Sequence, residues 1–140
     1  MDYPIELACI IDDDEMYVNL ITKIIDVKKL SRNLLVFRNG KQALDYFIAA
    51  LKNLKNQGIP QVILLDLNMP VMDGWQFLTA LSEQNLDNLK NTTIYIVSSS
   101  INSSDIERSK AIQQVSDFLI KPVNFDELEK AFTLRDNKVA

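Results

Sequence analysis

The stretch Cys9-Ile10-Ile11-Asp12-Asp13-Asp14 is an apolar run that stops abruptly at three carboxylates. A second run, Val62-Ile63-Leu64-Leu65-Asp66, stops at a fourth. Short apolar runs of this kind are typical of strands that are buried on both faces of a parallel sheet. Ligands of such sheets bind outside the carboxyl ends of the strands, so both groups of acids should lie at one edge. Because clustered carboxylates repel one another and carboxylate oxygens suit hard cations, the pattern predicts a divalent metal site, typically for magnesium.

Composition and charge narrow the class of protein. The chain has 140 residues, of which 47% are hydrophobic, and this suits one domain with a full core. Its net charge of −4 argues against non-specific binding to nucleic acid. The single cysteine, Cys9, cannot form an internal disulfide and is interpreted as a small buried hydrophobe. We recognise no signal peptide and no apolar stretch near the ~18 residues of a membrane span, so we expect a cytoplasmic protein without membrane contact.

The rest of the chain alternates between strand and helix patterns. The predicted strands are residues 7–11, 34–37, 62–65, 94–97 and 118–120. The predicted helices are residues 15–27, 41–56, 74–82 and 105–114, the last of these opened by a Ser104–Glu107 capping box, and a helix that Asn124 caps and that runs through Phe132.

Five strands that alternate with five helices imply right-handed βαβ units and a doubly wound α/β fold. The common order for a five-stranded parallel sheet of this class is 2-1-3-4-5. In that order the first and third strands are neighbours, so Asp66 should meet the acids at 12–14. No repeat or linker interrupts the sequence, and we expect a single domain over residues 1–140 with a core at about 5–134.

Two more strand ends add polar side chains to the same edge of the sheet. The predicted strand at 94–97 is followed by Ser98, and the strand at 118–120 is followed by Lys121 and Pro122. Acids, a hydroxyl and an ammonium together suit a phosphoryl group. A carboxylate can attack phosphorus to form an acyl phosphate, a divalent ion can bridge acids and phosphoryl oxygens, and a lysine supplies a positive charge.

With these elements in order, the chain resembles the receiver domain of bacterial two-component response regulators, which has the flavodoxin-like fold of the chemotaxis regulator. The resemblance covers roughly residues 5–134. The motifs that carry it are Ile11-Asp12-Asp13-Asp14, Asn39-Gly40, the run from Asp66 to Gly74 (Asp-Leu-Asn-Met-Pro-Val-Met-Asp-Gly), Ser98, and Phe118-Leu119-Ile120-Lys121-Pro122.

The resemblance implies a phosphoacceptor and a metal site. Asp66 would accept the phosphoryl group. Asp12 and Asp13 would hold Mg²⁺ or Mn²⁺ together with Asp66 and the main-chain carbonyl of Asn68. The phosphoryl donor would be a sensor histidine kinase or a histidine phosphotransfer protein.

The resemblance also implies a switch. Ser98 would move to meet the phosphoryl group, and Lys121 would contact it. The Lys121–Pro122 peptide bond is expected to be cis, a state that is tolerable before proline. Phe118 stands at the aromatic switch position and would turn inward when Ser98 moves.

Other polar and aromatic residues of these motifs have structural interpretations. Asp14 is expected to cap the following helix, where its charge also suits the helix dipole. Asp73-Gly74 should shape the turn into the helix at 74–82, and Asn39-Gly40 should begin the helix at 41–56. Trp75 could report on the site or simply pack in the core. No glycine precedes the fifth strand in Gln113-Gln114-Val115-Ser116, so the preceding helix could be displaced or longer.

Two other classes of protein compete with this interpretation. A magnesium-dependent phosphatase with an aspartyl nucleophile needs a second Asp two residues after the nucleophile, and here that residue is Asn68, which cannot donate a proton to a leaving group. A pseudo-receiver that only binds proteins usually lacks an acid, the hydroxyl or the lysine, and this chain keeps them all. We therefore expect a stand-alone receiver, not an enzyme beyond its own phosphorylation and dephosphorylation, that signals to an unknown downstream protein or passes the group on as a relay shuttle.

Overall fold

The computed structural model describes residues 3–52, 58–84, 89–112 and 115–133. Strands and helices alternate along the chain. The strands are β1 (Ile5–Ile11), β2 (Ser31–Phe37), β3 (Val62–Asp66), β4 (Thr93–Ser98) and β5 (Val115–Ile120). The helices are α1 (Glu15–Val27), α2 (Gly40–Leu51), α3 (Gly74–Ser82), α4 (Ser103–Ser109) and α5 (Phe125–Thr133).

The strands form one parallel sheet in the order β2-β1-β3-β4-β5, as the sequence predicts. The two strands that end at the clustered acids, β1 and β3, are direct neighbours, with Ile11 opposite Leu65. The acids that follow these two residues therefore leave the sheet side by side. β3 and β4 are buried along their whole length, which explains why their sequences are unbroken apolar runs.

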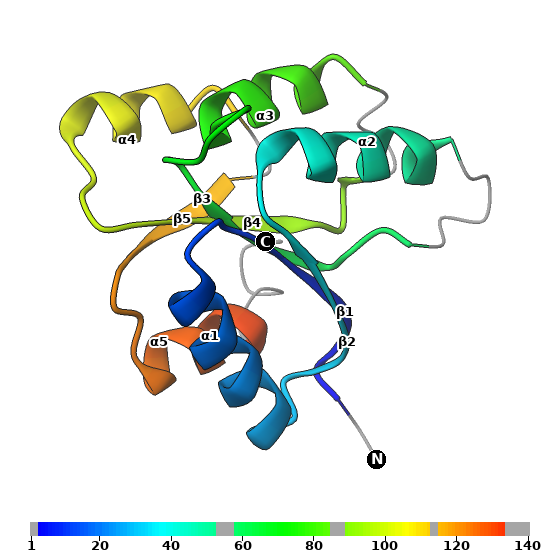
Figure 1. The fold of residues 1–140 in the computed structure, drawn as a ribbon, viewed down its shortest axis with the longest axis vertical. Coiled ribbons are helices and arrows are strands. Elements are labelled where there is room, and N and C mark those ends of the chain that lie inside the picture. Colours follow the sequence, from blue (N-terminus) through cyan, green and yellow to red (C-terminus); the bar gives the residue numbers. More distant parts are fainter. Residues whose placement is uncertain (1–2, 53–57, 85–88, 113–114, 134–140) are drawn as a thin grey trace.

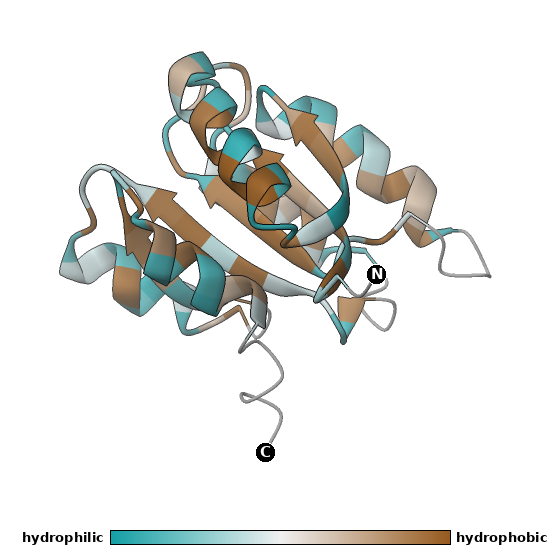
Figure 2. Cartoon of the chain, turned by 90° about the horizontal axis from the view of Figure 1, so that it is seen from below, coloured by the Kyte–Doolittle hydropathy of each residue, from teal (hydrophilic) through white to brown (hydrophobic). Residues whose placement is uncertain are grey.

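Helices cover both faces of the sheet. In Figure 1, α1 and α5 lie below it and α2, α3 and α4 lie above it. Alternate residues of the strands face opposite sides of the sheet. Ile10 and Leu64 belong to the core between the sheet and helices α1 and α5. Cys9 and Ile63 belong to the core between the sheet and helices α2 and α3. Figure 2 shows the strands as mostly hydrophobic and the helices as a mixture of hydrophobic and hydrophilic residues. Such layering is what amphipathic helices on a buried sheet produce.

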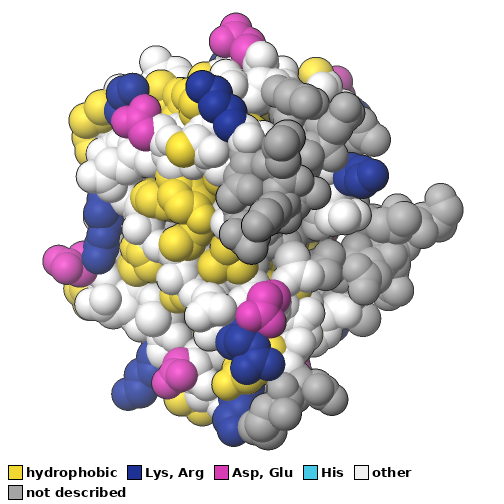
Figure 3. All heavy atoms as spheres, turned by 90° about the vertical axis from the view of Figure 1, so that its right-hand side faces the viewer, with side chains coloured by type: hydrophobic (Ala, Val, Ile, Leu, Met, Phe, Trp, Pro, Cys, Tyr) yellow, Lys and Arg dark blue, Asp and Glu magenta, His cyan; other side chains and the backbone are white. Residues whose placement is uncertain are grey.

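The outer strand β2 is less enclosed than its neighbours. Its last four residues are only partly buried, and the Phe37 ring packs against Tyr46 of α2 with 5.4 Å between ring centroids. Figure 3, turned to this side of the molecule, shows hydrophobic side chains that reach the surface there among scattered charges.

Short polar side chains cap three helices: Asp14, as the sequence predicts, and also Asn39 and Asp73, which were expected only to begin or shape the start of their helices. The side chains of Asp14, Asn39 and Asp73 accept hydrogen bonds from backbone N–H groups in the first turns of α1, α2 and α3. At α3 the cap is reciprocal, because the Gln76 side chain also accepts from the Asp73 N–H. These bonds satisfy donors that a helix start would otherwise leave open.

Several predicted boundaries were wrong. β1, β2, β4 and β5 begin earlier than predicted. α2 ends at Leu51 and not at residue 56; positions 53–57 lie outside the described residues. α4 is capped by Asn102, with Asp105 as the reciprocal partner, and not by the predicted Ser104–Glu107 box. It ends at Ser109, short of the predicted 114, and residues 113–114 also lie outside the described part.

The thiol of Cys9 is fully buried in β1, and burial raises its pKa well above the usual range. This confirms that the residue acts as a small hydrophobe. Within the described ranges, no helix is both long and apolar enough to span a membrane.

Candidate functional site

Three carboxylates meet at the carboxyl ends of β1 and β3. Asp12 and Asp66 are buried, with 1% and 6% of their surfaces exposed, while Asp13 is exposed. One carboxylate oxygen from each of the three lies within 4.8 Å of the others. The parallel pairing of β1 with β3 brings these acids together, as the sequence predicts.

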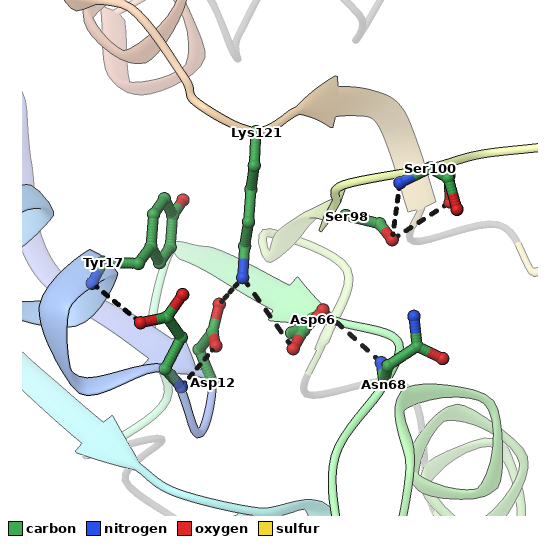
Figure 4. A network of polar contacts seen from close by, with 8 residues as sticks. Asp12, Tyr17, Asp66, Asn68, Ser98, Ser100 and Lys121 are labelled. Atoms are coloured by element: carbon green, nitrogen blue, oxygen red, sulfur yellow. Dashed lines mark hydrogen bonds and ion pairs between the residues drawn. The ribbon is translucent and has the colours of Figure 1, made fainter.

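Lys121, directly after β5, brings its ammonium into this group of acids. Its Nζ lies 2.9 Å from Asp12 Oδ2 and 3.9 Å from Asp66 Oδ2 (Figure 4). The other oxygen of Asp12, Oδ1, accepts a hydrogen bond of 2.9 Å from the Asp14 backbone N–H. Asp12 therefore has an ion pair on one oxygen and a hydrogen bond on the other. Asp66 lies farther from the Lys121 ammonium.

Asp66 carries an unusual pKa, raised from 3.8 to about 6. Burial is the largest cause, and the negative charge of Asp12 adds to it, with a smaller contribution from Asp13. The Lys121 ammonium and the Asn68 backbone N–H, which donates to Asp66 Oδ1 over 3.4 Å, act in the opposite direction. A carboxyl that is harder to ionise than usual is a more basic oxygen nucleophile, and perturbed pKa values gather at functional sites.

The acid cluster fits a hard divalent cation. Asp12, Asp13 and Asp66 offer oxygen ligands at mutual distances that one ion can span. Two of the three are buried next to a single ammonium, so the described residues leave the site with excess negative charge. A magnesium or manganese ion would offset that excess.

The two strand ends beyond β3 are tied to each other by the main chain. Ser98 at the end of β4 is fully buried, and its carbonyl accepts a 3.0 Å hydrogen bond from the Lys121 N–H. Its hydroxyl donates to the Ser100 carbonyl over 3.1 Å and lies 3.4 Å from the Ser100 N–H. Figure 4 shows Ser98, Lys121 and Asp66 at the same edge of the sheet. The Lys121–Pro122 peptide bond is cis, as predicted.

The remaining predicted residues lie around this centre. Phe118 in β5 is partly buried against the core under α2 and α3. Asn68 is exposed in the loop after β3. Trp75 is buried, so packing is its main role, but its ring also touches α4: its indole N–H donates to Asp105 over 3.3 Å, and the Arg108 guanidinium lies 4.7 Å above the ring.

Gly74, the first residue of α3, has a structural reason to be glycine. A Cβ on this residue would lie 2.5 Å from the carbonyl oxygen of Asp66 and 2.9 Å from the Cα of Leu67. The helix start is thus pressed directly against the main chain of the buried acid. Any larger residue would displace the backbone that positions Asp66.

Sequence reasoning missed one residue of the site, Tyr17. The ring of this α1 residue lies 4.4 Å from Lys121 Nζ. Periodicity indicates only that one face of α1 is apolar, and Tyr17 reads as one more core residue in that pattern. Its place in the first turn, three residues after the capping Asp14, is the signal that could have located it near the acids.

Comparisons with known proteins agree with this geometry. The family model described as "Response regulator receiver domain" matches residues 8–133. Response regulator Rcp1 from Synechocystis sp. is 28% identical over 127 residues, which cover 91% of this chain and 84% of that protein.

Solved structures show the same fold. A two-component response regulator from Cytophaga hutchinsonii superimposes with a TM-score of 0.83 at 22% identity, over 95% of this chain and 98% of that one. The Mn(2+)-bound form of response regulator Rcp1 gives a TM-score of 0.71 at 23% identity, over 94% and 92% of the two chains. The chain therefore belongs to the response regulator receiver domain family.

Proposed function

We propose that this protein accepts a phosphoryl group on Asp66 from the phosphohistidine of a sensor histidine kinase or a histidine phosphotransfer protein in the cytoplasm. The observation that carries the proposal is the cluster itself: three acids within 4.8 Å of one another, with the Lys121 ammonium 2.9 Å from Asp12 and 3.9 Å from Asp66. Membership of the receiver family supports it.

Phosphoryl transfer needs the protein mainly to position the reacting groups and to neutralise their negative charge. An oxygen of Asp66 attacks phosphorus in line, the P–N bond to the donor imidazole breaks, and the bonding electrons remain on the imidazole nitrogen. The raised pKa of Asp66, about 6, still leaves the side chain largely ionised at neutral pH while making it more basic than an ordinary carboxylate. Lys121 balances the charge of the new acyl phosphate.

Asp12, Asp13, Asp66 and the main-chain carbonyl of Asn68 are the proposed metal ligands, for Mg²⁺ or Mn²⁺. The bound ion would neutralise phosphoryl oxygens and lower the repulsion between the donor and the acids. The acid cluster supports this assignment, as does the Mn(2+)-bound form of the relative Rcp1.

Ser98 and Phe118 form the proposed switch. In the unphosphorylated protein the Ser98 hydroxyl is engaged with the Ser100 main chain. A phosphoryl group on Asp66 would offer it stronger, charged acceptors, so Ser98 would turn toward Asp66 and draw the start of the β4–α4 loop with it. Phe118, which is only partly buried, would then fill the vacated space. The altered surface would bind a downstream protein.

A relay role is the alternative, in which Asp66 passes the phosphoryl group to another histidine. Hydrolysis of external phosphate esters is disfavoured, because Asn68 at the second position after Asp66 has no proton to donate to a leaving group. The enzymatic activity proposed for this chain is therefore limited to its own phosphorylation and dephosphorylation.

Mass spectrometry after incubation with phosphoramidate and MgCl₂ tests the proposal. We expect the parent protein to gain one phosphoryl group and Asp66→Asn to gain none. Asp14→Asn is the matched control, because it changes a neighbouring acid that caps α1 and asparagine caps equally well. Undiminished labelling of Asp66→Asn would reject Asp66 as the acceptor, and steady release of phosphate without labelling would indicate a phosphatase.

A further inference from the structure

The aromatic ring of Tyr17 is a close neighbour of the lysine ammonium. Lys121 Nζ lies 4.4 Å from the ring centroid, inside the range of a cation–π contact (Figure 4). The Lys121 side chain is only 16% exposed, so the contact is partly shielded from water. Tyr17 itself is buried and fixed in the first turn of α1, where its N–H donates to the Asp14 cap.

The hydroxyl of Tyr17 does not explain why a tyrosine stands here. It is buried and has no hydrogen-bond partner among the described residues. Burial, followed by the charges of Asp12, Asp66 and Asp14, raises the pKa of the phenol above its usual value, so the ring stays neutral. The face of a neutral ring attracts a cation through its quadrupole.

We propose that Tyr17 is a positioning residue whose ring holds the Lys121 ammonium at the phosphorylation site. Asp12 is both the closest partner of that ammonium and a proposed metal ligand, so its negative charge has to be shared. The Lys121 ammonium lies near the carboxylates of Asp12 and Asp66 and the ring of Tyr17. A metal ion would compete for the two carboxylates but not for the ring. The ring would keep Nζ near Asp66 when Asp12 turns its charge toward a metal. This inference rests on the proposed function of Asp66.

Substitution separates the ring from the rest of the side chain. Tyr17→Leu keeps an apolar side chain but removes the ring, and we expect the rate constant for phosphorylation by phosphoramidate to fall about tenfold. That factor corresponds to about 1.4 kcal/mol, within the range of a partly desolvated cation–π contact. Tyr17→Phe keeps the ring and should rescue the rate. Ile24→Ala, a buried change seven residues farther along the same helix, controls for general loosening of α1.

A double-mutant cycle shows whether Tyr17 acts through Lys121. In a Lys121→Met background, adding Tyr17→Leu should leave the low residual rate unchanged, because the ring then has no ammonium to hold. If Tyr17→Leu slows phosphorylation in that background by the same factor as in the parent, the inference is overturned and the role of Tyr17 is merely structural. A Tyr17→Leu rate equal to that of the parent would overturn it as well.

A second measurement needs neither metal nor donor. Because Lys121 Nζ lies 4.4 Å from the ring centroid, the protons on the adjoining Cε should feel the ring current of Tyr17. NMR of the unphosphorylated protein should therefore show them shifted upfield in the parent and in Tyr17→Phe but not in Tyr17→Leu. An unchanged shift in Tyr17→Leu would overturn the contact. If the parent itself is not labelled on Asp66 while the upfield shift is present, the proposed function fails and the contact stands, so the two failures are distinguishable.

Discussion

Replacing the buried acid Asp66 with asparagine should make the unphosphorylated, metal-free protein more stable. The pKa of this carboxyl is raised from 3.8 to about 6, chiefly by burial and then by Asp12. Each pKa unit corresponds to about 1.4 kcal/mol, so the ionised side chain costs the folded state at most about 3 kcal/mol at neutral pH. Asparagine removes that cost and can still accept from the Asn68 N–H. Lys121 loses a partner at 3.9 Å but keeps Asp12 at 2.9 Å.

The effect has a definite pH dependence. Because the folded-state pKa of Asp66 is the higher one, the folded protein binds the proton more tightly than the unfolded chain does between pH 3.8 and about 6. The unfolding free energy of the parent therefore falls, relative to the variant, as the pH rises through that interval, and the difference is constant above it. Roughly half of the difference should be present at about pH 5 and all of it at about pH 7.5.

Urea unfolding in the presence of a chelator measures this difference, with fluorescence of the single tryptophan, buried Trp75, as the probe. In thermal unfolding the variant should gain up to about 10 °C, since about 1 kcal/mol shifts the midpoint by roughly 3 °C in a domain of this size. Asp117→Asn, a change at an exposed carboxyl of β5, is the control and should show no comparable gap. A gap of equal size at both pH values, or a less stable variant, would refute the reasoning.

Three further predictions concern metal, signal lifetime and fold. Magnesium should raise the midpoint of thermal unfolding, because it binds only the folded state. The shift should vanish in an Asp12→Ala, Asp13→Ala double mutant, and equal shifts in both proteins would place the metal elsewhere. Ser100→Leu should slow decay of the phosphorylated form after the donor is removed. Ser100 lies two residues after Ser98 and its main chain binds the Ser98 hydroxyl, so a bulky side chain there should obstruct the water that hydrolyses the acyl phosphate. Equally slow decay in the parent would contradict this. Gly74→Ala should lower the unfolding free energy by about 1–3 kcal/mol in chemical denaturation, because its Cβ would lie 2.5 Å from a main-chain oxygen; an unchanged value would show that α3 shifts freely.

The sequence was most informative where one physical effect dominated. Unbroken apolar runs that end at carboxylates are typical of buried parallel strands, and this interpretation places Asp12 beside Asp66 once the strand order is chosen. Capping by Asp14, Asn39 and Asp73 was also predictable, because short polar side chains at helix starts satisfy local donors. These features depend on neighbours in the sequence or on one repeated pattern.

The sequence was least informative where several weak effects compete. The start of α4 was predicted from the Ser104–Glu107 box alone. The cap built on Asn102 formed instead, and its partner Asp105 is also bound to Trp75 from another helix. The contact between Tyr17 and Lys121 joins α1 to the end of β5 and depends on the three-dimensional arrangement alone. A periodicity argument assigns Tyr17 to a face of its helix but does not identify what lies opposite.

The burial of Cys9 makes the chain convenient for site-specific labelling. It carries the single sulfhydryl of the protein, enclosed in the central β1 strand and held in the unreactive, protonated form. A cysteine engineered on the exposed side of α4, for example by Glu107→Cys, would then be the group that a maleimide dye reaches in the native protein. Energy transfer between Trp75 and such a dye would report in real time whether α4 moves on phosphorylation, without first mutating the native cysteine.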